Sequence, residues 1–439
     1  MTPKTLLALT ALTLSLPLAA AAQAPAAPQG SAVAEPAPAA LAASAPATSA
    51  ASTSAAAAAD VPHIPVPTPP SVPPALLRGT GDLGVVIERA TGSVLVVDQS
   101  DRAALCRIEG LGDLSHASLT FSPDERHAYV FGRDGGLSKL DILACTLEAR
   151  IVQAGNAIGG AISDDGKLVA VSNYEPGGVR VFDADTLAPV ADVPMGSKTV
   201  GLADVPGSRF IVATWDTGEV WLLDHARNPA KPEITRVEGV GKNPYDGLMT
   251  ADGRTYLVGL FGEKGLTTLD LWQDPPAVRR ILPDYGKEEP DLPVYKMPHL
   301  QGWTLAAGSY ALPAVGHHEV LWADAATGAE TGRTRVAGQP VFVTARPDAR
   351  ELWVNFAPPD NGTVQVLDAL THEVKRTLTP GRGILHMEFT PRGREVWLSA
   401  RDENKVLIYD TRTYELIGEV PAQAPSGIFF TARAHRMGL

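Results

Sequence analysis

The most regular pattern along this chain is a short, mostly apolar segment that ends in aspartate, such as VLVVD, VRVFD or VLIYD. Eight such segments follow one another after residue 77, and successive aspartates are 41 to 54 residues apart. This spacing is typical of the four-stranded blades of a β-propeller, and the 3.6-residue period that helical repeats of similar length need is missing. The closing residues are Asp98, Asp141, Asp183, Asp224, Asp270, Asp324, Asp368 and Asp410.

The second repeat shows the order of strands within one unit. Its sequence, SLTFSPDERHAYVFGRDGGLSKLDILACTLEARIV, gives an inner strand a, a Ser-Pro-Asp turn, strand b, a glycine turn, strand c ending at Asp141, and an outer strand d. Similar turns recur later as SDDGK, TADGR, RPDAR and TPRGR, in which Pro, Asp and Gly favour turn dihedrals. The pattern predicts an all-β fold, an eight-bladed β-propeller over residues 78–432.

The first repeat lacks one strand. It begins at LGVVIERATGSVLVVD, where strand a would be absent, whereas SGIFFTA at residues 426–432 is a strand without a repeat of its own. We expect this C-terminal strand to pair with the first blade and close the ring, because closure removes exposed sheet edges. Residues 433–439 would then form a C-terminal tail.

The chain before the propeller has two parts. Lys4, the apolar run at 5–18 and the alanines that follow predict a signal peptide over residues 1–22. The run is shorter than the roughly 20 residues that span a bilayer. Residues 23–77 are rich in Ala, Pro and Ser and predict a flexible linker. We expect a periplasmic protein, soluble after signal cleavage, without a lipoprotein cysteine; retention of the signal segment as an anchor stays open.

Composition and charge exclude some partners. The chain has 439 residues and a net charge of −12, which argues against nucleic acid because no dense basic footprint is present. Cys106 and Cys145 lack metal-ligand spacing, and the missing C-x-x-C-H motif indicates that no c-type haem is attached. They could pair in an oxidising compartment, but the favoured interpretation is two small buried residues.

Five tryptophans are assigned to packing between blades: Trp221, Trp272, Trp322, Trp353 and Trp397.

The predicted topology places many polar residues on one face of the ring. Strand a starts at one end of the central channel, so the d-to-a connections and the b-to-c turns share that face. Imidazole, aromatic and guanidinium groups collect there, which suits a planar, anionic ligand that carries a metal. The d-to-a positions are His116, Gly159-Gly160, Lys198-Thr199, Tyr245-Asp246, His299, Gln339-Pro340, His386 and Ser426. The b-to-c turns add Arg133, Asn173-Tyr174, Trp215-Asp216, Phe261-Gly262-Glu263, His317-His318, Asn355-Phe356 and Arg401.

A plainer interpretation of these residues stays open. A histidine at the start of an inner strand is often a hydrogen-bonded structural residue, so His116 alone is a weak signal. The turn at Tyr174 could be ordinary. No Ser-His-Asp order, phosphate-binding loop or zinc signature occurs in the chain.

One segment resembles a known family. HASLTFSPDERHAYVFGRDGGLSKLDI, residues 116–142, is similar to the d1-haem domain of cytochrome cd1 nitrite reductase, where the segment begins with the proximal haem-iron histidine and ends in a turn whose arginine meets a haem propionate. His116 and Arg133 are the matching positions. SNYEPGGVRVFDADTLAPV, FIVATWDTGEVWLLD and REVWLSARDENKVLIYD resemble further blades, so the likeness covers about residues 78–432.

The resemblance implies a ligand and a set of residues. The ligand would be haem d1 or its dihydro precursor, bound non-covalently through iron to His116, without a separate metal site. Propionates would meet Arg133, Lys198 and Arg382. Asn173, Tyr174 and Trp215 would form the pocket wall, and the distal or catalytic candidates are His299, Arg346 and Tyr245.

The chain also departs from the reductase. It has a linker where the reductase has a cytochrome c domain, and of the two distal histidines one could correspond to His299, whereas the other position reads Ala345-Arg346-Pro347. Within the family the chain therefore resembles a haem d1 biosynthesis protein and not a nitrite reductase.

We expect an exported protein that binds a late d1 precursor and takes part in its maturation. A non-catalytic carrier that delivers haem d1 to nitrite reductase is the alternative, and a scaffold without cofactor is a third. Whether the protein is an enzyme, such as an oxidoreductase acting on the precursor, is open. Partners would be nitrite reductase and other haem d1 maturation proteins, and a homodimer is also considered.

Overall fold

The computed structural model describes residues His63–Ile64, 79–285, 302–314 and 317–437. Its internal contacts divide the chain into Met1–Ala55 and Ala56–Leu439, and all described residues belong to the second unit. The predicted signal peptide, most of the predicted linker and His299 lie outside the described residues.

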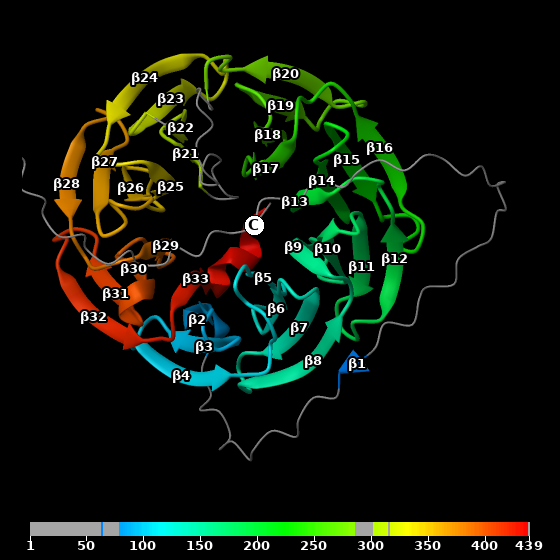
Figure 1. The fold of residues 1–439 in the computed structure, drawn as a ribbon, viewed down its shortest axis with the longest axis horizontal. Helices are drawn as coiled ribbons and strands as arrows, with labels where there is room; N and C mark the ends of the chain where they lie inside the picture. The colour runs from blue at the N-terminus through cyan, green and yellow to red at the C-terminus, as the bar shows by residue number, and fades with distance from the viewer. Residues whose placement is uncertain (1–62, 65–78, 286–301, 315–316, 438–439) are drawn as a thin grey trace, which may run out of the picture. The chain divides into compact units, whose positions relative to one another are not determined.

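Eight antiparallel sheets surround a central axis, with the first strand of each sheet innermost (Figure 1). The predicted eight-bladed propeller is confirmed. Blade 1 contains β33 (Pro425–Phe430), β2 (Leu83–Glu88), β3 (Ser93–Asp98) and β4 (Ala103–Ile108). Blade 2 contains β5 (Ser118–Phe121), β6 (His127–Phe131), β7 (Gly136–Asp141) and β8 (Thr146–Val152). Blade 3 contains β9 (Asn156–Ile162), β10 (Leu168–Glu175), β11 (Val179–Asp183) and β12 (Pro189–Val193). Blade 4 contains β13 (Thr199–Val205), β14 (Arg209–Thr214), β15 (Glu219–Asp224) and β16 (Glu233–Val237).

The second half of the ring repeats this arrangement, and short 3₁₀ turns complete the fold. Blade 5 contains β17 (Pro244–Met249), β18 (Thr255–Leu260), β19 (Leu266–Asp270) and β20 (Ala277–Ile281). Blade 6 contains β21 (Thr304–Ala306), β22 (Ser309–Ala314), β23 (Glu319–Asp324) and β24 (Glu330–Arg335). Blade 7 contains β25 (Pro340–Ala345), β26 (Glu351–Phe356), β27 (Val364–Asp368) and β28 (Val374–Leu378). Blade 8 contains β29 (Ile384–Phe389), β30 (Glu395–Ala400), β31 (Lys405–Asp410) and β32 (Leu416–Pro421). The 3₁₀ turns are η1 (Thr80–Asp82), η3 (Arg401–Glu403) and η4 (Thr431–His435).

The repeated aspartate ends strand c in every blade and shapes the turn that follows. In blade 1 the Asp98 carboxylate accepts the backbone N–H groups of Ser100 at 2.9 Å and Asp101 at 3.0 Å. Each of the other seven aspartates accepts an equivalent backbone bond. A short side-chain acceptor at this position satisfies turn donors locally, which is why the strand ends there.

The C-terminal strand closes the ring as predicted. β33 pairs antiparallel with β2, so that Val85 lies opposite Phe429 and Val86 lies opposite Ile428. The Thr431 hydroxyl after β33 donates to the carbonyl oxygens of Thr80 at 2.8 Å and Leu83 at 3.1 Å. Sequence ends that are some 350 residues apart therefore share one sheet, and blade 1 has its inner strand.

The turn η4 continues from β33 toward the middle of the ring (Figure 1). The Arg433 guanidinium donates to the buried Glu388 carboxylate of β29 at 3.0 Å, and His435 Nε2 lies 2.7 Å from Glu125 in the a–b turn of blade 2. Met437 packs against the apolar cluster shared by blades 4 and 5. η4 and the residue pair after it thus connect blades across the channel at the end where the inner strands finish.

Two sequence interpretations are corrected. Cys106 of β4 and Cys145 of the blade 2 c–d turn form a disulfide, so they are not two separate buried thiols. The bond ties blade 1 to blade 2. Trp272 is 67% exposed with the Arg254 guanidinium over its ring, because it lies in the turn after β19, whereas the other four assigned tryptophans are buried.

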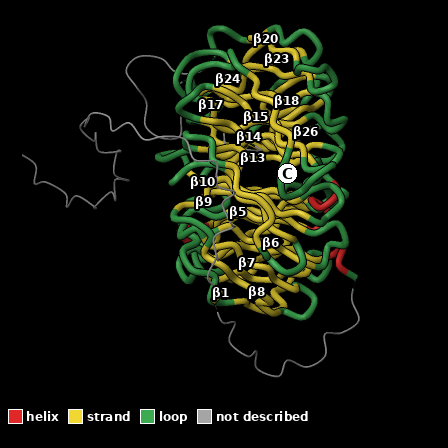
Figure 2. Tube along the Cα trace, turned by 90° about the vertical axis from the view of Figure 1, so that its right-hand side faces the viewer, coloured by secondary structure: helices red, strands yellow, loops and turns green. Residues whose placement is uncertain are grey.

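The predicted linker contains one described element. β1 (His63–Ile64) pairs antiparallel with Ile151 and Arg150 of β8 and adds a fifth strand to the outer edge of blade 2 (Figure 1). Figure 2 shows the strands stacked through the depth of the ring with loops on both faces. None of the described helices has the length and apolar character needed to cross a membrane.

Candidate functional site

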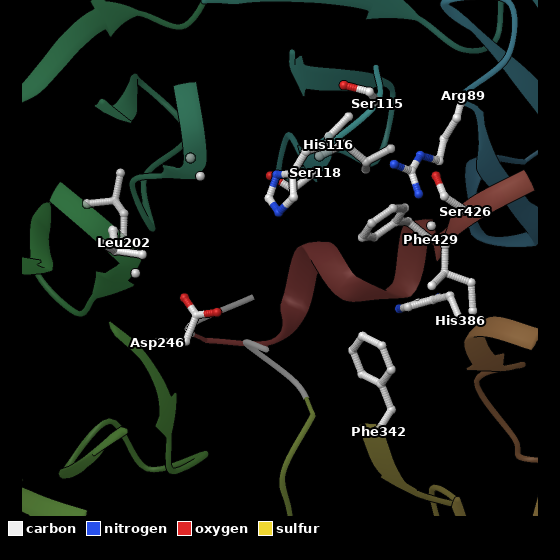
Figure 3. A pocket seen from close by; sticks show the side chains of 18 of the residues that line it. Arg89, Ser115, His116, Ser118, Leu202, Asp246, Phe342, His386, Ser426 and Phe429 are labelled. Atoms are coloured by element: carbon white, nitrogen blue, oxygen red, sulfur yellow. The ribbon is translucent and has the colours of Figure 1, made fainter. Parts of the chain in front are cut away.

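A cavity of about 300 Å³ lies where the inner strands begin (Figure 3). Its volume is at the lower end of the range for small-molecule sites. Among the described residues, inner strands of every blade except blade 6 contribute; residues 286–301, which include His299, lie outside them. The lining residues used below are Arg89, His116, Gly159, Tyr245, Phe342, His386 and Phe429.

His116 stands at the start of the inner strand of blade 2 and lines this cavity. The approach to β5 is held by Asp113, whose carboxylate accepts the Ser115 N–H at 2.8 Å and whose carbonyl oxygen accepts the Arg133 N–H at 2.8 Å. The glycine turn that carries Arg133 therefore adjoins the d-to-a connection that carries His116. The two segments that carry the family resemblance are thus neighbours, although only His116 lines the cavity.

Two arginines lie near Asp113. Hydrogen bonds from Ser115, and then the positive charges of Arg133 and Arg89, lower the pKa of the Asp113 carboxyl. Arg89 lines the cavity, whereas Arg133 does not. Sequence reasoning missed Arg89, although ERATGS between the first two strands was recognisable as the b–c turn of the incomplete first repeat. A guanidinium beside a partly enclosed cleft can bind a ligand carboxylate.

Phe342, His386 and Phe429 form an aromatic part of the cavity wall, and Figure 3 shows the Asp246 side chain on another part of that wall. The His386 ring lies between two aromatic rings, edge-on to Phe342 with centroids 5.6 Å apart and stacked on Phe429 at 5.5 Å. Its Nδ1 accepts the Ile428 backbone N–H at 3.2 Å. Burial, with the Arg433 charge, lowers the pKa of His386 to about 3, so this imidazole is neutral at physiological pH.

Tyr245 also lines the cavity, whereas the predicted wall residues do not. The Trp215 ring contacts Tyr245 with centroids 5.8 Å apart, in a second layer. Asn173 is buried and exchanges hydrogen bonds with Gln153 and Thr199, which makes it a support for its turn. The Lys198 ammonium lies over the Tyr174 ring at 5.1 Å. Asn173, Tyr174, Trp215 and Lys198 do not line the cavity.

Besides Arg133, two further predicted arginines lie away from the cavity lining. Arg346 follows β25 in an a–b turn, where its guanidinium pairs with Asp348 at 2.8 Å and Glu351 at 2.9 Å. The six residues of β25 span about 20 Å, so this turn is at the far end of the blade. Arg382 is 79% exposed and lies 3.9 Å from Glu403. Of the distal candidates in the described residues, only Tyr245 reaches the cavity.

Comparison with known proteins places the chain in a family. The model of the cytochrome D1 heme domain matches residues 78–434. NirF from Stutzerimonas stutzeri is 56% identical over 371 residues, covering 83% of this chain and 95% of that protein. The chain belongs to the NirF family of d1 haem domain proteins. NirF from Pseudomonas aeruginosa PAO1 is likewise 56% identical and is covered to 94%.

A solved structure agrees with the NirF assignment. The dihydro-heme d1 dehydrogenase NirN, in complex with DHE, superposes with a TM-score of 0.73 at 25% identity, covering 85% of this chain and 80% of NirN. NirN is also a d1 haem propeller, so the two proteins share both the propeller fold and sequence similarity over most of their length. Membership of the NirF family supports a role in haem d1 biosynthesis or maturation.

The cavity residues fit a flat, iron-bearing ligand with carboxylates. An imidazole at His116 is a ligand that haem iron accepts, and Arg89 offers a partner for a carboxylate. Gly159 presents only its backbone to the cavity. A Cβ at this position would fit, since the one atom within 4 Å of it is the Ser172 hydroxyl at 3.5 Å. Glycine at a position with room for a side chain keeps the wall free for a ligand.

Proposed function

We propose that the propeller binds a late d1-type tetrapyrrole precursor and takes part in its maturation for nitrite reductase. The observation that carries the proposal is the position of His116 in the central cavity of a NirF-family propeller. NirN, which is similar in structure and is named a dihydro-heme d1 dehydrogenase, was solved with DHE bound. His116 would ligate the haem iron without a covalent attachment of the macrocycle to the protein.

The remaining roles in this proposal follow from position. Arg133 and Arg89 would meet carboxylates at the rim, since both lie near Asp113 beside the cavity. Tyr245 would lie on the distal side, and His299 is kept as its distal companion. Lys198 would guide the ligand from the adjoining turn.

We further propose that the protein is exported. Residues 1–22 have the pattern of a signal peptide and residues 23–77 that of a linker. The Cys106–Cys145 disulfide supports this location, because disulfides persist in oxidising compartments such as the periplasm. The ligand would therefore be bound after translocation.

A carrier that delivers haem d1 to nitrite reductase is the second candidate. It is favoured by the neutral state of His386, because a group with a pKa of about 3 is a poor general base at neutral pH. Incubating purified protein with dihydro-haem d1 and an electron acceptor separates the two functions: conversion of the precursor indicates maturation chemistry, and unchanged precursor indicates a carrier.

The test of the site is a titration with haem d1. An imidazole bound to iron sets the absorption spectrum of a haem, so we expect His116→Ala to shift the spectrum of the bound ligand and weaken its binding. A melting curve controls for folding, since His116 lies at the cavity and not between blades. An identical bound spectrum in wild type and His116→Ala would contradict ligation by His116.

A further inference from the structure

His386 lines the cavity from the inner strand of blade 8 and belongs to none of the roles assigned above. We propose that His386 is a positioning residue that donates its Nε2–H to an oxygen atom on the rim of the bound tetrapyrrole. This inference rests on the proposed function, because it assumes that a tetrapyrrole enters the cavity.

The hydrogen bond from β33 determines which ring nitrogen carries the proton. The Ile428 N–H points at Nδ1 of His386 at 3.2 Å, so Nδ1 must accept and cannot carry hydrogen. A neutral imidazole has one N–H, which is then on Nε2. In Figure 3 the ring extends from β29 toward the open centre of the cavity with a nitrogen at its tip. The donor therefore faces the space that a ligand would occupy.

The surroundings hold the ring in one orientation. Phe342 from β25 packs edge-on and Phe429 from β33 stacks on it, while the His386 backbone N–H donates to Ser399 Oγ at 2.8 Å. The two aromatic neighbours and the bond from Ile428 leave the imidazole little freedom to turn, and the bond to Ser399 holds the backbone that carries it. A donor that is oriented before binding loses little entropy when a ligand arrives.

The charge state of the His386 imidazole determines which kind of ligand atom its Nε2–H can bind. Burial opposes protonation of His386, and the positive charge of Arg433 acts in the same direction. A neutral N–H binds an oxygen acceptor without requiring a counter-charge. The acceptor on the ligand is a ring carbonyl or a carboxylate oxygen, and a cationic or purely apolar edge would leave the Nε2–H without a partner.

Two amide substitutions separate the hydrogen bond that His386 accepts at Nδ1 from the one that it donates at Nε2. In His386→Asn the side-chain oxygen reaches the place of Nδ1, so the variant can keep the bond from Ile428 but has no donor at the place of Nε2. In His386→Gln the longer amide carries an N–H at the place of Nε2 but loses the acceptor for Ile428. The two variants thus have similar polarity and opposite defects.

Each variant is titrated with haem d1 and with iron protoporphyrin, which lacks ring carbonyl groups. For haem d1 we expect about ten-fold weaker binding to His386→Asn at an unchanged melting temperature. We expect near wild-type binding to His386→Gln, at a lowered melting temperature. A higher carbonyl stretching frequency of bound haem d1 in His386→Asn alone assigns the acceptor to a ring carbonyl. Equal weakening for both haems assigns it to a carboxylate.

Equal binding of haem d1 by wild type and His386→Asn, with the same carbonyl band, would overturn the proposal. So would equal losses in the two variants, because the histidine would then act only through the bond from Ile428. If wild type itself binds no tetrapyrrole, it is the proposed function that fails, and the titration of wild type shows this before any variant is made.

Discussion

At the scale of single residues, charge and position divide the arginines of this protein into two groups. Arg89 and Arg133 lie near the Asp113 carboxyl beside the cavity, whereas Arg346 is held by Asp348 and Glu351 at the far end of blade 7. The number of arginines predicted for one face therefore does not show which of them can reach a ligand; the position of the turn that carries each arginine decides this. The family resemblance identified Arg133, and the structure adds Arg89.

Replacing Arg133 by alanine should weaken tetrapyrrole binding by about ten- to a hundred-fold, because a charged hydrogen bond contributes roughly 1.5 to 3 kcal/mol. The absorption spectrum of the bound ligand should hardly change, since Arg133 is not the iron ligand in this proposal. A haem d1 titration measures both quantities. The matched control is Arg382→Ala, an exposed arginine on a different blade, which should bind as wild type does. Equal losses in both variants would indicate only a general charge effect.

The pKa of His386 predicts a dependence of stability on pH. The ring titrates near 6.5 when unfolded and near 3 when folded, so the unfolded chain binds the extra proton first. Its contribution is fully present above pH 6.5 and is lost as the pH falls toward 3, by at most about 1.4 kcal/mol per pH unit. Melting curves between pH 7 and pH 4 should therefore fall more steeply for wild type than for His386→Gln. Parallel curves would mean that His386 is protonated equally in both states.

At the scale of strands and turns, the sequence was informative where a residue causes the local structure. The closing aspartates predicted the ends of eight strands because each carboxylate accepts a turn N–H in the structure. The glycine turn after β6 was also predictable, because its residues themselves favour the turn conformation. His116 precedes the inner strand β5 and lines the cavity, on the face that the predicted strand order gives it.

Features that depend on contacts between distant segments could not be predicted in this way. Spacing did not decide whether Cys106 and Cys145 pair, because the bond joins two blades. β1 docks on β8 through backbone bonds that leave no side-chain pattern in an Ala/Pro-rich segment. His386 was placed on the correct face, but its tautomer depends on Ile428, which is on a strand of another blade.

Removing residues 426–439 should cause unfolding or aggregation. The deletion takes away β33, which leaves the edge of β2 unpaired, and η4, whose Arg433 neutralises the buried Glu388 carboxylate. An exposed strand edge templates aggregation, and a buried charge without its partner costs several kcal/mol. Size-exclusion chromatography and a melting curve measure the effect. A chain truncated after residue 437 keeps both elements and should behave as wild type.

A stable, monodisperse protein after the longer deletion would contradict the closing role of β33. The comparison with truncation after residue 437 separates the loss of β33 and η4 from the loss of the last residues alone.

At the scale of the whole molecule, the propeller gathers its functional residues by topology and not by sequence proximity. Inner strands begin on one face, so residues from Arg89 to Phe429 meet around one cavity. η4 connects blades 1, 2 and 8 at the other end of the channel. The cavity thus lies at one end of the channel, and the contacts of η4 contribute to the stability of the ring at the opposite end.

This organisation predicts that the protein does not reduce nitrite catalytically. Turnover requires repeated electron delivery to the haem iron, and the sequence has no C-x-x-C-H motif to attach an electron-donating c-type haem. Its two cysteines are joined to each other, so neither offers a thiol for covalent haem attachment. The segment Ala345-Arg346-Pro347, which the resemblance matches to the second distal histidine of the reductase, lies in an a–b turn away from the cavity and supplies no distal histidine there. Protein loaded with haem d1 and reduced beforehand, with excess reductant removed, should release at most about one nitric oxide per haem when it is mixed with nitrite and a reduced c-type cytochrome, as measured with a nitric oxide electrode. Multiple turnovers at the rate of a nitrite reductase run in parallel would show that one propeller face suffices for the reaction and would refute assignment of this chain to cofactor maturation.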